Sequence, residues 1–209
     1  MNRAIQQFQT NVQSAKQLGV IYQAFTGKVT RAISLDELLR AEIVLGVSAL
    51  DCYIHDIVRI GMGQAFKAGK GESNAYLSFG VSLDFVKKLL STTNDSDKLG
   101  LFEHEIRRLH SFRTFQTAEN ISQALSLIGI KSMWEKVGNS IGVSPADTRM
   151  RLNLIIDRRN CIAHESDIDP TLGVGNKYPI DFQLVENTVD FLDKIVHAIH
   201  EIAKSEGVF

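Results

Sequence analysis

The sequence predicts an all-α protein, folded as a helical bundle with an N-terminal helical arm. Only three prolines interrupt 209 residues, and alternating patterns typical of strands are almost absent. Hydrophobic residues make up 44% of the chain and charged residues 22%, which is enough apolar material for a sizeable core. We expect one domain over residues 1–209, with the arm at 1–33 and the core bundle at 34–205.

The first half of the chain begins with a polar, glutamine-containing helical pattern at residues 3–26. Ser34 is followed three positions later by Glu37, a capping-box spacing that predicts the start of the next helix. From residue 35 to about 66 the chain is apolar on nearly every side, which predicts a central, buried helix. Four glycines between residues 61 and 74 predict a loop.

The second half alternates polar breaks with shorter helical patterns. Ser82 is predicted to cap a helix that runs to about Leu90. Ser144 followed by Pro145 is a strong helix start, and that helix is expected to run to Glu165. The other expected segments are a polar break at 94–96, helices at 98–115, 118–127 and 131–141, a loop at 169–179, and a last helix at 181–203.

Charge and composition limit the classes of function. The net charge is −1, so any RNA-binding surface must be a local basic patch. Cys52 and Cys161 lie in apolar segments and are predicted to be small core residues, not a disulfide pair. No apolar run of about 18 residues predicts a membrane span, and Met1 leads into a polar run unlike a signal peptide, so the cytoplasm is the expected location.

The segment from residue 149 to 165 combines an apolar stripe with reactive side chains. At about 100° per residue, Arg159 falls within the stripe, where a guanidinium is unfavourable unless it is paired or faces a cavity. Asn160 and His164 are four residues apart and therefore neighbours on an adjacent polar face. The expected stripe is Leu152, Ile155, Ile156, Ile162 and Ala163; the expected polar face also holds Asn153 and Asp157, and Arg158 points elsewhere.

These residue types suit cleavage of a phosphodiester bond. An arginine binds a phosphate and stabilises developing negative charge, and a histidine transfers protons near neutral pH. Attack by an RNA 2′-hydroxyl needs both tasks and no metal. The alternative is structural: Arg159 pairs with a buried carboxylate, such as Asp51 or Glu42, and His164 is a satisfied histidine at a helix end.

Arg159-Asn160 followed by His164 near the end of a late helix resembles the signature of HEPN domains. The wider context, over roughly residues 35–200, is similar to the RiboL-PSP-HEPN branch of that superfamily. The positions that carry the resemblance are 38–42, 47–51, Phe115-Gln116, Asn120-Ile121, Trp134, 158–165, Asp167, Asp169-Pro170 and 178–180.

This resemblance implies a metal-independent endoribonuclease that leaves 2′,3′-cyclic phosphate and 5′-hydroxyl ends. His164 would be the acid and base, Arg159 would hold the scissile phosphate, and Asn160 would orient these groups. The resemblance also implies a homodimer in a toxin–antitoxin or anti-phage defence setting, with an antitoxin or defence protein as a partner. Ser166 stands where related toxins carry a tyrosine that an antitoxin modifies, which argues against that form of control.

Other residues are candidates for supporting roles. Asp51 and His55 lie four residues apart on the predicted central helix and are candidates, with Arg158 and Glu165, to support the catalytic residues. The alternative for Asp51 and His55 is an internal polar network that stabilises the bundle. The RNA-binding candidates are Arg107, Arg108 and Arg113, which are interleaved with aromatic residues; a solvated charged helix face is their alternative. No metal, cofactor, DNA or membrane partner is expected.

A second function stays open beside the ribonuclease. Some HEPN proteins are scaffolds, and the small net charge favours a non-catalytic helical module that binds a nucleotide, RNA or a partner protein. Toxicity on expression that His164→Ala relieves would favour the enzyme, and equal growth with both proteins would favour the module.

Overall fold

The predicted all-α fold is confirmed. The computed structural model describes residues 2–30, 33–173 and 175–208, and these residues form nine helices and no strand. Within the same ranges, Ile168 and Lys177 form an isolated antiparallel bridge. The outer limits expected for the domain, 1 and 209, and positions 31–32 near the end of the arm lie outside the described residues.

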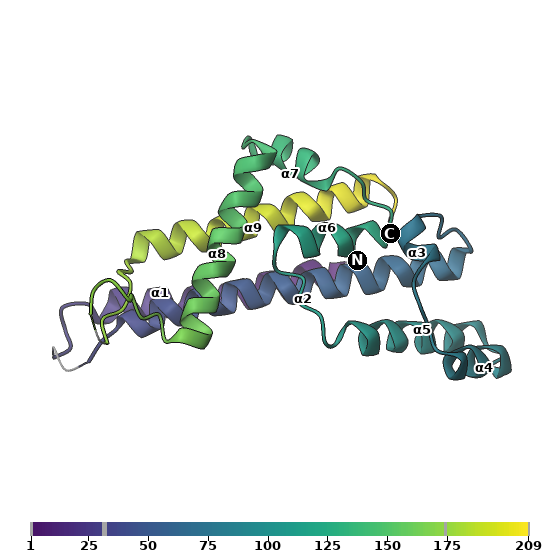
Figure 1. The fold of residues 1–209 in the computed structure, drawn as a ribbon, viewed down its shortest axis with the longest axis horizontal. Coiled ribbons are helices and arrows are strands. Elements are labelled where there is room, and N and C mark those ends of the chain that lie inside the picture. The colour runs from purple at the N-terminus through teal and green to yellow at the C-terminus, as the bar shows by residue number, and fades with distance from the viewer. Residues whose placement is uncertain (1, 31–32, 174, 209) are drawn as a thin grey trace.

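A long central helix, α2, organises the molecule (Figure 1). Helices α1 and α9 pack along α2, α5 packs against it with α4 on the outside, and α8 crosses it steeply. Helices α6 and α7 connect these parts. The bounds are α1 Asn2–Phe25, α2 Asp36–Ala68, α3 Asn74–Leu77, α4 Leu83–Ser91, α5 Asp95–His110, α6 Ala118–Ser126, α7 Met133–Ile141, α8 Pro145–Glu165 and α9 Phe182–Ser205.

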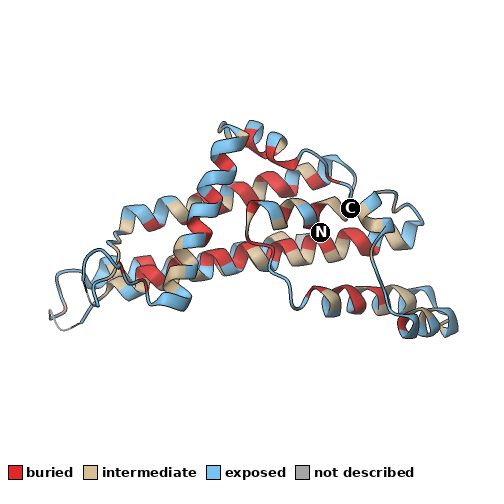
Figure 2. Cartoon of the chain, in the orientation of Figure 1, coloured by how far each residue is buried: buried red, intermediate tan, exposed pale blue. Residues whose placement is uncertain are grey.

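The core follows α2, as its all-round apolar pattern predicts. Leu39, Leu50, Ile54 and Ile57 have no exposed surface, and Figure 2 shows buried residues along α2 and α9. Each such side chain contributes about 1.5–3 kcal/mol by leaving water. The α1 helix turns one narrow apolar face to this core, including Phe8, so the predicted arm packs on the bundle.

The capping box predicted at the start of α2 is wrong. Leu35 occupies the N-cap position and no side chain caps the helix. Glu37, which was expected to complete the box with Ser34, instead accepts hydrogen bonds from Lys177 Nζ at 2.7 Å and Arg40 Nη1 at 3.4 Å. These charged partners, one of them 140 positions away, are a better match for the carboxylate than a backbone N–H.

The loop predicted to begin at residue 61 begins only at Gly69. Gly61 and Gly63 lie inside α2 and are buried. A Cβ atom at Gly61 would lie 2.6 Å from Ile128 Cγ2 and 2.8 Å from Val208 Cγ1, closer than side chains can pack. Glycine at this position therefore serves close packing within a helix, and not a turn.

Other boundaries shift because side chains cap the helices. Ser82 and Ser144 cap α4 and α8, as predicted. The α5 helix starts at Asp95, three residues early, because Asn94 Oδ1 accepts the backbone N–H of Ser96 at 2.8 Å. It ends at His110, five residues early, and residues 111–117 form a linker to α6. The short helix α3 was not predicted.

Neither cysteine is a buried core residue, which corrects the prediction. Cys52 is exposed and Cys161 is half-buried, and neither forms a disulfide. Both lie on helices whose outer faces are less covered than their apolar sequence suggests. No helix in the described part of the chain is both long and apolar enough to cross a membrane.

Candidate active site

The candidate catalytic residues lie in the last two turns of α8. The helix begins where the Ser144 hydroxyl accepts the backbone N–H of Asp147 at 3.1 Å. It ends at Glu165, and the next two residues, Ser166 and Asp167, have φ values of 55° and 61°. Residues with a side chain adopt this left-handed conformation at a cost of roughly 1–2 kcal/mol each, so the surrounding contacts must hold the turn in place.

Arg159, Asn160 and His164 remain available to a ligand. Arg159 is half-buried, and Asn160 and His164 are exposed. Arg159 Nη1 donates to Asn160 Oδ1 at 3.1 Å, and the buried Arg159 Nε has no hydrogen-bond partner. In the described part of the chain, no hydrogen bond or ion pair engages His164. The amide thus orients the guanidinium, and the imidazole lies one turn further along the helix.

The expected ion pair of Arg159 with a buried carboxylate is absent among the described residues. Asp51 instead accepts the backbone N–H of Phe115 at 2.6 Å and Gln116 Nε2 at 3.2 Å. Glu42 is buried, its Oε2 has no hydrogen-bond partner, and burial raises its pKa to about 7. Neither carboxylate engages Arg159, so the structural alternative loses its proposed partners.

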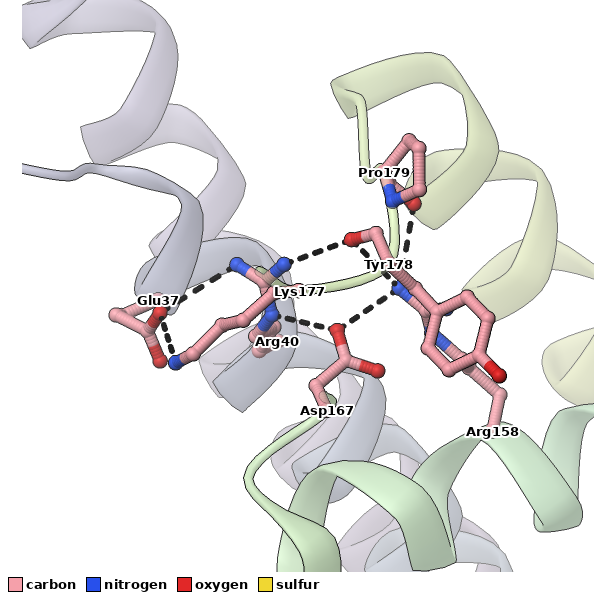
Figure 3. Close-up of polar contacts among 7 residues, drawn as sticks. All are labelled: Glu37, Arg40, Arg158, Asp167, Lys177, Tyr178 and Pro179. Carbon is pink, nitrogen blue, oxygen red and sulfur yellow. Dashed lines mark hydrogen bonds and ion pairs between the residues drawn. The ribbon is translucent and has the colours of Figure 1, made fainter. Parts of the chain in front are cut away.

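The neighbouring arginine, Arg158, has several partners at its Nη2 (Figure 3), although its buried Nε has none among the described residues. Its Nη2 lies 2.9 Å from Asp167 Oδ2 and 3.2 Å from the carbonyl oxygens of Tyr178 and Pro179. Its guanidinium also lies 5.0 Å from the centroid of the Tyr178 ring, a cation–π distance. Arg158 therefore fastens the end of α8 to the segment that leads into α9.

Arg40, from the start of α2, completes the same arrangement. Its Nε donates to Asp167 Oδ2 at 2.6 Å and its Nη2 donates to the Tyr178 carbonyl at 2.9 Å. The side chain of Asp167 is 0% exposed and that of Arg40 is 5% exposed, so solvent hardly screens this ion pair. We call Glu37, Arg40, Arg158, Asp167 and Lys177 the Asp167 cluster.

The Asp167 cluster fixes how the candidate catalytic residues lie relative to the bundle. It joins the start of α2, the end of α8 and the turn that contains the Ile168–Lys177 bridge. It contains three cationic side chains and two carboxylates. The cluster therefore has one net positive charge, although the whole chain carries −1, and its Arg158 directly precedes Arg159 in the sequence.

Two of the residues expected to support the motif, Asp51 and His55, lie on a part of α2 that faces α5. Asp51 and His55 face α5 and the linker, where the His55 ring packs 4.4 Å from that of Phe115. Asp51 is eleven residues from Arg40 on α2, about 16 Å along the helix. The structure thus corrects the expectation that they contact the motif and favours the internal polar network. Glu165, the other expected supporting residue, is exposed at the last turn of α8.

The three RNA-binding candidates have different surroundings. Arg108 donates twice to Glu105, at 2.8 and 2.7 Å, and this forked ion pair engages its guanidinium. Arg107 and Arg113 are exposed and line a pocket beside His55. The local basic patch is therefore smaller than the sequence suggests, and its two remaining members converge.

The chemistry of the motif region is that of acid, base and anion binding. No group of three or more histidine, cysteine, aspartate or glutamate side chains in the described part of the chain could hold a metal ion. Burial, and then the charge of Glu165, raises the pKa of the Cys161 thiol, so a thiolate nucleophile is disfavoured there. Arg159 and His164 are the groups able to bind a phosphate and to transfer a proton.

Sequence reasoning missed the Asp167 cluster as a unit. Asp167 and Arg40 entered only as positions of family resemblance. One signal was available: an arginine on a helix that is apolar on nearly every side needs a buried carboxylate partner. The sequence gives no means of choosing Asp167, 127 positions away, as that partner.

Comparison with known proteins gives one finding. A family model described as RiboL-PSP-HEPN matches residues 10–205, which span nearly all of the described helices. No curated protein and no solved structure matches the chain. The match indicates an RNA-related role.

Proposed function

Because the chain belongs to the RiboL-PSP-HEPN family, we propose that it is a metal-independent endoribonuclease whose catalytic residues are Arg159, Asn160 and His164. The observation that carries the proposal is the availability of Arg159 and His164 at the end of a helix that is otherwise firmly held. A structural arginine is expected to have a carboxylate partner, as Arg158 does.

The proposed reaction is an internal transfer at phosphorus. His164 accepts the proton of the RNA 2′-hydroxyl, whose oxygen attacks the adjacent phosphorus atom. The bond from phosphorus to the 5′-oxygen breaks, that oxygen receives the proton from the protonated His164, and the products carry a 2′,3′-cyclic phosphate and a 5′-hydroxyl. Arg159 stabilises the extra negative charge on the phosphate in the transition state, and Asn160 holds the guanidinium in position.

The test is cleavage of end-labelled RNA in excess EDTA, with identification of the product ends. We expect wild-type protein to cut, and His164→Ala and Arg159→Ala to cut about 10²–10⁴-fold more slowly, the range of a positioned acid–base group. Asp157→Asn is the matched control, because Asp157 is exposed on the same helix and forms no ion pair with the described residues. All variants are expected to unfold at the wild-type temperature.

Cleavage that persists in both motif variants would contradict the proposal. Cleavage by none of the proteins, on several classes of RNA, would favour the non-catalytic module that binds nucleotide, RNA or a partner. The overall charge of −1 is the observation that favours this second candidate.

We also propose that the protein is a cytoplasmic homodimer acting in toxin or anti-phage defence, with an antitoxin or defence protein as a partner. Support for the dimer comes from an apolar pocket of about 330 Å³ between α8 and α9, lined by the exposed Leu154 and Leu184 and by Arg158. Sedimentation of wild-type protein and of Leu154→Glu tests this: a dimer that the substitution leaves intact would exclude this face as the interface.

A further inference from the structure

A second pocket lies away from the motif, between α2 and the end of α5. Its volume is about 470 Å³, which lies within the usual range for ligand pockets. It opens where the 111–117 linker leaves α5, and its lining is rich in cationic and imidazole groups: Arg59, Arg107, Arg113, His55 and His110. No role in the proposed reaction accounts for this concentration of groups.

The carboxylates of this pocket already have partners. Asp51 accepts two hydrogen bonds from the linker, and Asp56 lies 3.0 Å from Arg59 Nη2. Arg59 also pairs with Glu103 at 2.5 Å. The negative charges are therefore engaged by the protein itself and are not free to bind a cation.

Two guanidiniums at the rim have no such partners. Arg107 and Arg113 are exposed, and neither side chain forms a hydrogen bond or ion pair within the described ranges. They come from the last turn of α5 and from the linker, and they converge on one pocket. An arginine pair in this arrangement matches the oxygen atoms of a phosphate.

The two histidines add unused hydrogen-bonding capacity. His55 Nε2 is 3.8 Å from Asp51 Oδ1, too far for a hydrogen bond. His110 is buried, and its Nδ1 has no hydrogen-bond partner. Burial, followed by the charges of His55 and Arg113, lowers the pKa of His110 to about 4, as expected beside an uncompensated positive field.

We propose that this pocket binds a phosphate group of single-stranded RNA, held by Arg107 and Arg113 with His55 at the base. Phe112, in the linker next to Arg113, is 94% exposed and offers its ring to a stacked base. An adjoining pocket of about 310 Å³, lined by Phe112, Arg113, Asn120 and Gln123, has room for that base and amides for its edge.

The linker connects this pocket with the motif helix. Figure 1 shows the linker passing from α5 to α6. The linker is fixed to α8 at its end, where the backbone N–H of Ala118 donates a hydrogen bond of 3.0 Å to Asn153 Oδ1. Arg159 lies six residues beyond Asn153, about 9 Å along α8. A strand that enters the motif can therefore continue along the linker. The bound strand is the substrate only if the proposed function holds; the pocket itself is tested by binding.

The experiment measures RNA binding by the full chain carrying His164→Ala, in EDTA, by fluorescence anisotropy of a labelled single strand of about 12 nucleotides, within the site sizes usual for single-strand binders. The test variant adds Arg107→Gln and Arg113→Gln, and a second variant adds Phe112→Ala. A charge-matched control instead adds Lys67→Gln and Lys70→Gln, two exposed lysines near the end of α2 and outside the pocket. Unfolding temperatures of all proteins are compared first.

We expect the double arginine variant to bind at least about tenfold more weakly than the lysine control. The slope of log affinity against log salt should become shallower by about 0.7 for each phosphate that the protein no longer neutralises. Phe112→Ala should weaken binding without changing that slope, since a stacked ring carries no charge. Equal affinity of the arginine variant and the lysine control, or no RNA binding by the His164→Ala chain, would overturn the proposal.

A competition experiment distinguishes a pocket that binds an RNA strand from one that binds a free nucleotide. Adenosine monophosphate should displace the labelled strand only at concentrations far above the dissociation constant of the strand. Displacement at comparable concentrations would overturn the assignment to RNA. If the wild type does not cleave RNA but RNA binding still depends on the two arginines, the proposed reaction is rejected and the proposed RNA-binding pocket is supported.

Discussion

Arg158 and Arg159 are adjacent on α8, yet their environments are opposite. Arg158 is bound to a buried carboxylate, two carbonyl oxygens and an aromatic ring. The side chain of Arg159 forms one hydrogen bond within the described part of the chain, from its Nη1 to the side-chain amide of Asn160. The first arginine uses its hydrogen bonds to hold the fold, and the second leaves most of its hydrogen-bond donors without a partner among the described residues.

The difference shows how a small site becomes preorganised. Catalytic groups are effective when the elements that carry them do not move during the reaction. The Asp167 cluster holds the last turns of α8 against α2, so Arg159 and His164 can be exposed and still have a fixed geometry. Residues that hold the end of α8 and residues proposed to act in catalysis are thus neighbours, and substitutions can separate their effects.

The largest expected effect on stability comes from Asp167→Asn. Neutralising this carboxylate removes the charged partner of the half-buried Arg158 and, within the described ranges, leaves the buried Arg40 with only the exposed Glu37 at 3.4 Å, which destabilises the fold by about 3–5 kcal/mol. Urea unfolding measures the change, and Asp157→Asn on the exposed side of α8 is the control. A destabilisation below about 1 kcal/mol, the worth of an ordinary surface ion pair, would show that the cluster does not hold the helix.

Glu42 is a second buried carboxylate, but unlike Asp167 it has no arginine partner in the part of the chain that the structure describes, and its Oε2 forms no hydrogen bond there. Its pKa is raised from 4.5 to about 7, so the folded protein retains a proton that the unfolded chain releases. Stability is therefore lost as the pH rises from about 4.5 to 7. Glu42→Gln stays neutral and should be more stable than wild type by up to about 3 kcal/mol at about pH 8, with little difference near the unfolded pKa. A constant difference in the free energy of unfolding between the two proteins across this pH range would contradict the assignment of this effect to Glu42.

Lysine substitutions compare the two arginines directly. Arg158→Lys keeps the charge but cannot reach the carboxylate and both carbonyls, and should cost about 1–2 kcal/mol of stability. Arg159→Lys should change stability by less than about 0.5 kcal/mol, since Arg159 makes few contacts. Thermal unfolding of both variants measures this, and equal destabilisation would remove the distinction between the two arginines.

The smallest expected effect is an increase in the free energy of unfolding on Ser166→Gly. Ser166 closes α8 with φ at 55°, a conformation that glycine adopts without strain. We expect the variant to be more stable by about 0.5–1 kcal/mol, with Ser205→Gly, in the last turn of α9, losing stability as the reference. A destabilised Ser166→Gly protein would mean that the turn does not store strain.

Periodicity and caps predicted most of the fold. The pattern from residue 35 to 66 indicated the central helix, and Ser82 and Ser144 indicated correct helix starts. The failures have physical causes in distant contacts. Gly61 is helical because Ile128 and Val208 approach it, and Glu37 does not cap because Lys177 attracts it. Local sequence cannot contain either fact.

The site was predictable in its residues but not in its support. The spacing of Asn160 and His164 places them on one surface of α8, as the structure shows. The same helical geometry placed Ala163 in the apolar stripe, yet Ala163 is exposed because α8 runs past the core at its end. The partner of Arg158 could not be found by helical spacing, because Asp167 lies past the end of α8 and is the second of two left-handed residues there.

The ion pair between Arg40 and Asp167 joins positions 127 residues apart, and this has a consequence for the order of assembly. Contacts of such long sequence separation form late, because a large loop must close first. During synthesis, all of the helices from α1 to α7 are made before Asp167 and Tyr178, the partners of Arg40. We expect the amides of Asp167 and Tyr178 to gain protection after those of α2 in pulse-labelled hydrogen exchange during refolding. The end of α8 that carries Arg159 and His164 is therefore fixed to α2 only after the residues that follow α8 have been made.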